Sequence, residues 1–148
     1  MVRATLRIRN GFCLAAITVC CTMVKLGPSR AVDGVKVTLA DYAVGRGKAP
    51  GVPSPKPGHR FLQTHWSYQN DADHVVVLGK TQAISGGRTY EARMFGGPAN
   101  IGALRPGQEG YARWWFEVPV TAREVQLVYE SPDGARGVWN LSMGSAAK

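Results

Sequence analysis

Cysteine is scarce in this sequence of 148 residues: there are three, and all of them lie within the first 21 positions. A domain formed by the rest of the chain therefore has no disulfide and depends on its hydrophobic core for stability. Histidine is equally scarce, with three residues, and acidic side chains number only ten. These shortages exclude a disulfide scaffold and a cysteine nucleophile in that domain, and they leave few groups for a metal centre or an acid–base pair.

The sequence also lacks a hydrophobic run long enough to cross a bilayer, which needs about 20 apolar residues. The apolar run Gly11–Val24 has 14. The beginning of the chain has instead the three parts of a secretory signal peptide: the basic residues Arg3, Arg7 and Arg9, then the apolar run, then the small residues of Ser29-Arg30-Ala31. We therefore expect residues 1–31 to be removed and residues 32–148 to form an exported domain, periplasmic or secreted, without a stable membrane span.

Lipid attachment is an alternative for this leader, because Cys20 stands near the end of the apolar run. A bacterial lipobox has a leucine-like residue and two small residues before its cysteine, and Val19 fits poorly at the last of those positions. We therefore expect signal cleavage without lipidation and keep lipidation of Cys20 as the alternative.

The positive charge of the chain belongs largely to the leader. Its removal takes away five basic residues and no acidic one, so the formal net charge falls from +8 to +3. The basic residues that remain are scattered along the sequence, and a nucleic-acid partner is therefore not expected. The remaining 117 residues are enough for one domain, since a chain of that length buries roughly two thirds of its surface.

The most regular pattern lies between Leu104 and Val118, where a turn is followed by a strand. Pro106 and Gly107 fit the two central positions of a turn. From Gly110 onward, side chains alternate between an apolar face and an amphipathic face. The first comprises Ala112, Trp114, Phe116 and Val118, and the second comprises Tyr111, Arg113, Trp115 and Glu117. We expect the first face, Trp114 included, to lie in the core.

Further strands are predicted at 35–42, 60–69, 74–78, 82–84, 89–92, 125–130 and 138–143, with Asn70-Asp71-Ala72-Asp73 as a turn. The run at 74–78 has no polar alternation, so we expect a central strand that forms a hairpin with 60–69. Ser85-Gly86-Gly87-Arg88 is expected to join the next two strands in a tight turn. The proline-rich stretch 45–59 is expected to be a surface loop, and 121–124 is the one place for a single helical turn. The fold class is therefore all-β: an immunoglobulin-like antiparallel β-sandwich of seven to eight strands.

The order of these features is similar to that of a known group of domains. Its marks are, in order, Arg60-Phe61-Leu62, Asn70-Asp71, Gly87 to Tyr90, the Pro-Gly-Gln turn within Leu104 to Gln108, Trp115 to Pro119, and Val125 to Tyr129. The sequence resembles the telokin-like, immunoglobulin-fold extracellular domains of bacterial secreted proteins and lipoproteins of unknown function, which include mycobacterial immunoprotective antigens. The resemblance covers about residues 34 to 143. It implies a sandwich outside the cytoplasm and carries over no catalytic residue.

A metal site is the one chemical centre that the residues suggest. His65 and His74 are expected on adjacent strands, and Met94 could add a soft ligand for copper. The alternative is that both histidines are outward polar residues of a hairpin. No combination of serine, histidine and acid is placed for nucleophilic catalysis.

The outward face of the strand at 110–118 suggests a binding surface. Tyr111, Arg113 and Trp115 would stand in a row there, and exposed aromatic rings beside a guanidinium are typical of surfaces that bind proteins or sugars. The alternative is that the loop at 45–59 covers this face.

We therefore expect an exported, non-catalytic binding or structural module of the bacterial envelope or medium. Its partner would be a protein or a glycan, and no cofactor is indicated. The alternative is a periplasmic protein that handles copper or zinc through His65, His74 and Met94.

Overall fold

The computed structural model describes residues 28–45, 51–95 and 102–144. Their strands, in chain order, are β1 Arg30–Val32, β2 Val35–Gly45, β3 His59–Asn70, β4 Val76–Val77, β5 Lys80–Ser85, β6 Arg88–Glu91, β7 Ala103–Leu104, β8 Glu109–Pro119, β9 Glu124–Glu130 and β10 Arg136–Ser142. The described residues contain no helix, and hence no helix that could cross a membrane. Of residues 121–124, expected as a helical turn, the first three lie in an irregular turn that the Ala122 amide closes on the Pro119 carbonyl, and Glu124 begins β9.

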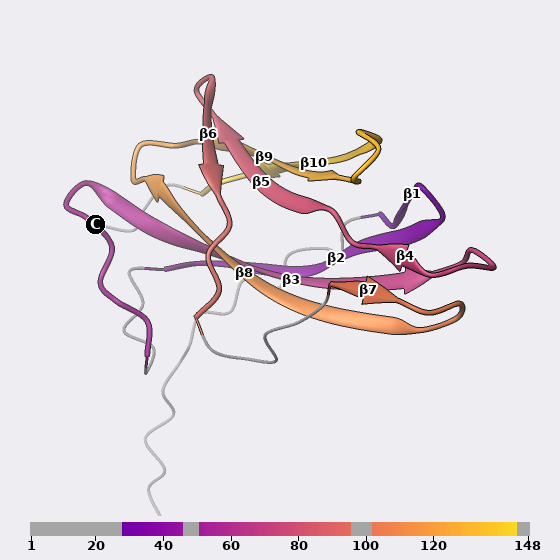
Figure 1. Cartoon of the computed structure of the whole chain (residues 1–148). Helices are drawn as coiled ribbons and strands as arrows, with labels where there is room; N and C mark the ends of the chain where they lie inside the picture. Colours follow the sequence, from indigo (N-terminus) through magenta and orange to yellow (C-terminus); the bar gives the residue numbers. More distant parts are fainter. Residues whose placement is uncertain (1–27, 46–50, 96–101, 145–148) are drawn as a thin grey trace, which may run out of the picture.

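Two four-stranded sheets form the two layers of the fold (Figure 1). The first sheet has the order β1-β2-β3-β8 and the second β10-β9-β5-β6, while β4 and β7 form a small third sheet. Every pairing is antiparallel. Without β1, the two orders correspond to A-B-E and G-F-C-C′ of an immunoglobulin domain. The expected all-β, immunoglobulin-like sandwich is confirmed.

The core lies between the two sheets and follows the alternation that the sequence shows. Phe116 and Val118 of β8 and Leu127 of β9 are fully buried. At the centre, the Trp66 and Trp139 rings meet edge to face, with centroids 4.8 Å apart, a preferred geometry for aromatic pairs. The hairpin of β5 and β6 is also confirmed, because Gly86 and Gly87 both have positive φ angles of 55° and 73°, as a type I′ turn requires.

The expectation of a central strand at 74–78 is wrong. Only β4 forms there, and it pairs with β7 instead of β3. Val75 and Val77 are 57% and 58% exposed. Both edges of β3 are already occupied, by β2 and β8, so no further strand can pair with it. The apolar run is a passage from the first sheet to the second, where β5 begins.

The folded unit begins before the expected cleavage point. Arg30 and Ala31 pair with β2 through a two-residue turn at Asp33 and Gly34. The Trp139 indole donates a hydrogen bond of 2.8 Å to the Pro28 carbonyl, and the Arg30 guanidinium lies 5.6 Å from the centroid of the same ring. The expected boundary after residue 31 therefore falls within β1, and residues 1–27 lie outside the described residues.

Asn70 joins the end of β3 to the two turns beside it. Its side chain is fully buried and donates to the carbonyls of His74 and Leu104 at 2.7 and 2.9 Å, while its Oδ1 accepts from the Ala72 amide at 2.8 Å. Its backbone carbonyl accepts from Gly107, whose φ of 71° confirms the expected turn before β8. Asn70 thus fixes the end of β3 beside the turn that precedes β8.

We predict that Asn70→Ala lowers the free energy of unfolding by about 2–4 kcal/mol, because it leaves buried carbonyls without donors. Asn140, exposed on β10, is the matched control, and Asn140→Ala should change stability by less than about 0.5 kcal/mol. Urea unfolding followed by tryptophan fluorescence measures both values. Equal losses in the two variants would contradict this role for Asn70.

Candidate functional site

The outer face of the first sheet, turned away from the second sheet, is built from rows of side chains that run across β2, β3 and β8. The registers of the two pairings define these rows. From one end of the sheet to the other, the rows are Lys36, Gln69 and Glu109; Thr38, Ser67 and Tyr111; Asp41, His65 and Arg113; Ala43, Gln63 and Trp115; and Gly45, Phe61 and Glu117. The first three rows are polar or amphipathic, and we call them the open half of the face.

Trp115 does not belong to the exposed surface, which corrects the expectation for this residue. It is 6% exposed. Its ring packs edge to face against Phe61, at a centroid distance of 5.8 Å, and against Phe95, at 6.1 Å. The backbones of Arg93 and Trp115 also exchange two hydrogen bonds, of 2.8 and 2.9 Å. The chain that follows β6 thus crosses to β8 and covers this end of the face (Figure 1).

The proline-rich loop, expected as a possible cover, reaches only the next position along β8. The Lys56 amide donates to Glu117 Oε1 at 2.5 Å, and the Lys56 ammonium lies 4.0 Å from Oε2. Arg93 approaches the same carboxylate at 3.7 Å. The described residues 51–58 form no strand, as expected, while residues 46–50 lie outside the described residues. The proline-rich loop, through Lys56, and the segment after β6, through Arg93, therefore both contact the Glu117 carboxylate.

The open half contains a shallow trough of about 180 Å³. Its lining residues are Ser29, Lys36, Thr38, Ser67, Tyr68, Gln69, Glu109 and Tyr111. Tyr111 is 62% exposed, and its hydroxyl donates to Glu109 Oε2 at 2.7 Å. That hydrogen bond, and then the charge of Glu109, raise the pKa of Tyr111, so the phenol stays neutral. Of the three expected binding residues, Tyr111 and Arg113 are exposed and Trp115 is not.

The polar residues of this trough cannot be identified from the sequence alone. Alternation along the predicted strand that begins at residue 60 places Ser67 and Gln69 on one face and says nothing more about them. Their partners on β2 and β8 depend on the register between strands that are distant in sequence. The alternation along β2 and β3 predicts on which face of the sheet a side chain lies. It does not predict which side chains of the neighbouring strands stand in the same row.

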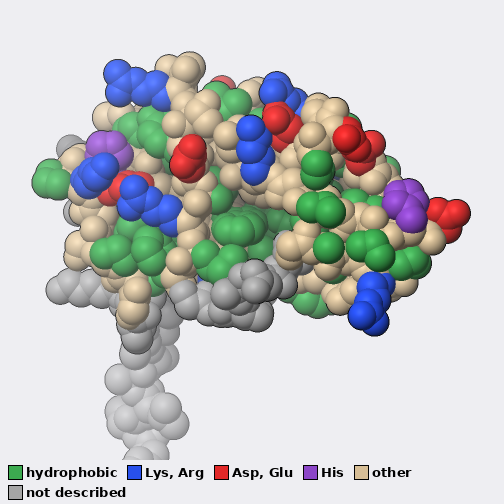
Figure 2. All heavy atoms as spheres, viewed as in Figure 1, with side chains coloured by type: hydrophobic (Ala, Val, Ile, Leu, Met, Phe, Trp, Pro, Cys, Tyr) green, Lys and Arg blue, Asp and Glu red, His purple; other side chains and the backbone are tan. Residues whose placement is uncertain are grey.

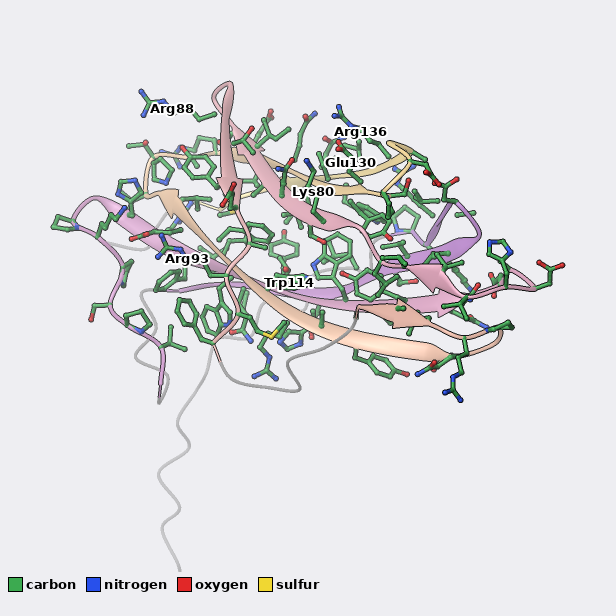
Figure 3. The ribbon with its side chains drawn as sticks, viewed as in Figure 1. Lys80, Arg88, Arg93, Trp114, Glu130 and Arg136 are labelled. Carbon is green, nitrogen blue, oxygen red and sulfur yellow. The ribbon has the colours of Figure 1, made fainter. Side chains whose placement is uncertain are left out.

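Trp114 points to the inner side of the sheet, as expected, and packs against the core while remaining half-buried (Figure 3). Its indole donates a hydrogen bond of 3.1 Å to the Tyr68 hydroxyl. Burial raises the pKa of Tyr68 to about 12, so this hydroxyl also remains neutral at physiological pH. Trp114 therefore supports the sandwich and has no part in the outer face.

His65 and His74, two of the three residues of the expected metal site, lie in different parts of the fold. His65 stands in β3, where its Nδ1 lies 2.9 Å from Asp41 Oδ1 and its Nε2 lies 2.8 Å from Gln63. His74 follows β3, beyond Asn70, and contacts Asp73. Asn70 is the fifth residue after His65 in β3, a span of about 16 Å along the strand. Met94, the third residue, follows Arg93 in the segment that crosses to β8. In the described parts of the chain, no group of three or more His, Cys, Asp or Glu side chains could hold a metal ion.

Basic side chains gather at the end of the molecule formed by β6 and the proline-rich loop (Figure 2). Two hollows lie there, of about 460 and 300 Å³, and Tyr90 lines both. Arg88 and Arg93 line one each, but Glu124 and Glu117 line the same two hollows. Because each hollow is lined by carboxylates as well as by cations, neither presents charges of one sign alone.

A second charged cluster lies on the outer face of the second sheet (Figure 3). Glu130 accepts hydrogen bonds from Arg136, with a shortest distance of 2.5 Å, and lies 3.3 Å from Lys80. The hydrogen bond from Arg136, and then that from Lys80, lower the pKa of Glu130. The three residues are opposite one another in β5, β9 and β10, so this cluster joins the ends of three strands.

We predict that Trp115→Ala costs about 3–5 kcal/mol of stability, because it removes a large buried ring. Trp115→Phe should cost much less, since the indole Nε1 has no hydrogen-bond partner among the described residues and a smaller ring keeps the aromatic contacts. Tyr111→Ala should stay within about 0.5 kcal/mol of wild type. Thermal and urea unfolding of the three variants test this order. A Trp115→Ala protein as stable as Tyr111→Ala would show that the ring is not covered.

Comparison with known proteins confirms the fold. No protein-family model matches the sequence, and no curated protein sequence matches it either. An uncharacterised β-sandwich protein of Clostridium difficile is similar in structure, with a TM-score of 0.55 and 14% identity over 79% of this chain and 91% of that chain. A protein of unknown function from Listeria monocytogenes has a TM-score of 0.58 and 8% identity, over 82% of this chain and 83% of that chain. A candidate lipoprotein of Bacillus subtilis has a TM-score of 0.57 and 9% identity, over 77% of this chain and 38% of that chain. At these identities the likeness shows that the chain is a β-sandwich.

Proposed function

We propose that this protein is an exported, non-catalytic module that binds a glycan of the cell envelope in the trough of the open half. The observation that carries the proposal is an exposed tyrosine beside two rows of hydrogen-bonding side chains. A sugar ring has hydroxyl groups at its rim and apolar C–H faces. Ser67, Gln69 and Glu109 offer donors and acceptors for the hydroxyls, and the Tyr111 ring offers an apolar face with a polar tip.

The composition of the open half favours a glycan over a protein partner. Protein interfaces have an apolar centre surrounded by a polar rim. The trough has no such centre, since its exposed aromatic ring stands among serine, threonine, glutamine and charged side chains. The most exposed valines, Val75 and Val77, lie on and beside β4 instead. The trough therefore fits a glycan better than a protein partner.

The number of carboxylates in the trough is consistent with binding without catalysis. Glycoside hydrolysis uses two carboxyl groups that flank the scissile bond. Glu109 is the one carboxylate among the residues that line the trough, and it already accepts a hydrogen bond from Tyr111. The telokin-like assignment and the extracellular location remain part of this proposal and are supported by the resemblance of the sequence. No contact favours the metal-handling alternative, because both ring nitrogens of His65 are already engaged.

The contacts of residues 28–31 bear on the processing of the leader. Cleavage after Ala31 would remove the Pro28 carbonyl and Arg30, which both contact Trp139, and part of β1. Lipidation at Cys20 would retain all of them. We therefore infer that the mature chain begins upstream of Pro28.

We predict that the mass of the mature protein, purified from its native envelope or medium, includes residues 28–31. A mass larger by two or three acyl chains and starting at Cys20 would identify a lipoprotein, and an unmodified start between residues 21 and 28 would identify cleavage upstream of β1. Either result supports the inference. A chain that starts at Val32 would contradict it.

The glycan proposal is tested by co-sedimentation with purified cell-wall sacculi and by titration with the soluble wall polysaccharide. We predict that Tyr111→Ala and Gln69→Ala each weaken binding by at least about tenfold, the effect of losing about 1.4 kcal/mol. Val77→Ala, an exposed residue outside the trough, is the control and should bind as wild type does. Wild-type protein that binds neither preparation, or Tyr111→Ala protein that binds as well as the control, would contradict the proposal.

A further inference from the structure

The outer edge of β8 has no continuous partner strand in the described part of the fold. β8 has 11 residues and is the longest strand that ends a sheet, since β10, β6 and β1, which also end their sheets, have seven, four and three. Its register with β3 is uninterrupted, so no bulge twists the edge away. The bridge between Arg93 and Trp115 is the one pairing on its outer side among the described residues. Proteins normally protect such an edge, because its free N–H and C=O groups recruit another strand.

The bridge also fixes which backbone groups the edge presents. Trp115 directs both its N–H and its C=O outward, to Arg93. In an antiparallel strand this direction alternates from residue to residue. Glu109, Tyr111 and Arg113 therefore direct their backbone groups to the open edge as well, while Ala112 and Trp114 direct theirs to β3.

The side chains of these same residues make the edge complementary to itself. When two copies of β8 meet antiparallel with Tyr111 opposite Tyr111, the residue opposite Glu109 is Arg113 of the second copy, and the reverse holds by symmetry. Residues with outward backbone groups then face one another at all three positions. The arrangement has one two-fold axis, as an isologous dimer requires, and places opposite charges across the strands, which is the favourable cross-strand pairing.

We propose that the protein forms a symmetric dimer through residues 109–113 of β8, so that the two first sheets join into one continuous sheet. Tyr111 lies at the two-fold axis, and two pairs of Glu109 and Arg113 flank it. Arg93 limits the contact, because it occupies the edge at Trp115. The pairing does not depend on the proposed glycan, since it uses the edge of β8, and it places the two troughs side by side.

Sedimentation of the full exported domain over about 10 μM to 1 mM tests the proposal, a range suited to contacts smaller than the usual 1,200–2,000 Å². Wild-type protein should show a reversible monomer–dimer equilibrium. Glu109→Arg and Arg113→Glu should each weaken it at least tenfold, because each places like charges opposite one another. The double variant Glu109→Arg/Arg113→Glu should dimerise again. Glu91→Arg, which changes an exposed residue of β6, is the control and should dimerise as wild type does.

Mixing the two single variants distinguishes the proposed register of the two β8 strands from any other dimer contact. One chain then has arginine at both positions and the other has glutamate at both, so a heterodimer should form between two proteins that are monomeric alone. Circular dichroism confirms that each variant is folded before mixing. The proposal is overturned if wild type stays monomeric at 1 mM, if its dimer tolerates both charge reversals, or if the folded single variants do not associate when mixed.

Discussion

The two backbone hydrogen bonds between Arg93 and Trp115, of 2.8 and 2.9 Å, determine what the first sheet presents to its surroundings. They hold the chain that leaves β6 against the outer side of β8, and this places Phe95 on the ring of Trp115. The end of the outer face around Trp115 is thereby covered. The open half, from Glu109 to Arg113, has no covering segment and no strand paired to its outer edge among the described residues. The proposed functions of the protein belong to this second half.

Charge and polarity follow the same division. Glu117, at the covered end, is held by Lys56 and Arg93, so its charge is already compensated within the molecule. At the open end, Glu109 accepts a hydrogen bond from the Tyr111 hydroxyl, and the Arg113 side chain is exposed. The trough therefore combines a fixed donor–acceptor pair with side chains that are free to meet a ligand. The sandwich core beneath it, centred on Trp66 and Trp139, provides a rigid support.

The sequence was sufficient for the features that depend on local patterns. Alternation located β8, β9 and β10, and the paired glycines at 86 and 87 located the β5–β6 hairpin. Features that depend on distant contacts were not predictable. Nothing near Trp115 indicates that Phe61 and Phe95 cover it, and an outward position in a strand says only on which side of the sheet a residue lies. The run at 74–78 indicates a central strand that does not form, because an apolar passage between layers has the same composition as a central strand.

Two elements depend on turns that the sequence indicates only in part. Asp33-Gly34 is a strong signal for a two-residue hairpin, and it joins β1 to β2. The residues of β1 overlap the small residues that are typical of a cleavage site, so the same stretch has two possible interpretations. Asn70 was recognised as part of a turn, but its three side-chain hydrogen bonds reach Leu104, which is 34 residues away. Such a role becomes visible only when the turns after β3 and before β8 are seen together.

Amide hydrogen exchange along β8, measured residue by residue in dilute protein, tests the division of this strand most directly. The account predicts a strongly protected Trp115 amide, because it is bonded to Arg93, and protected Ala112 and Trp114 amides, because these are directed to β3. The amides of Tyr111 and Arg113, directed to the open edge, should exchange orders of magnitude faster. Equal protection of Tyr111, Arg113 and Trp115 would show that the edge is already occupied within one molecule, and would contradict both the open half and the dimer built on it.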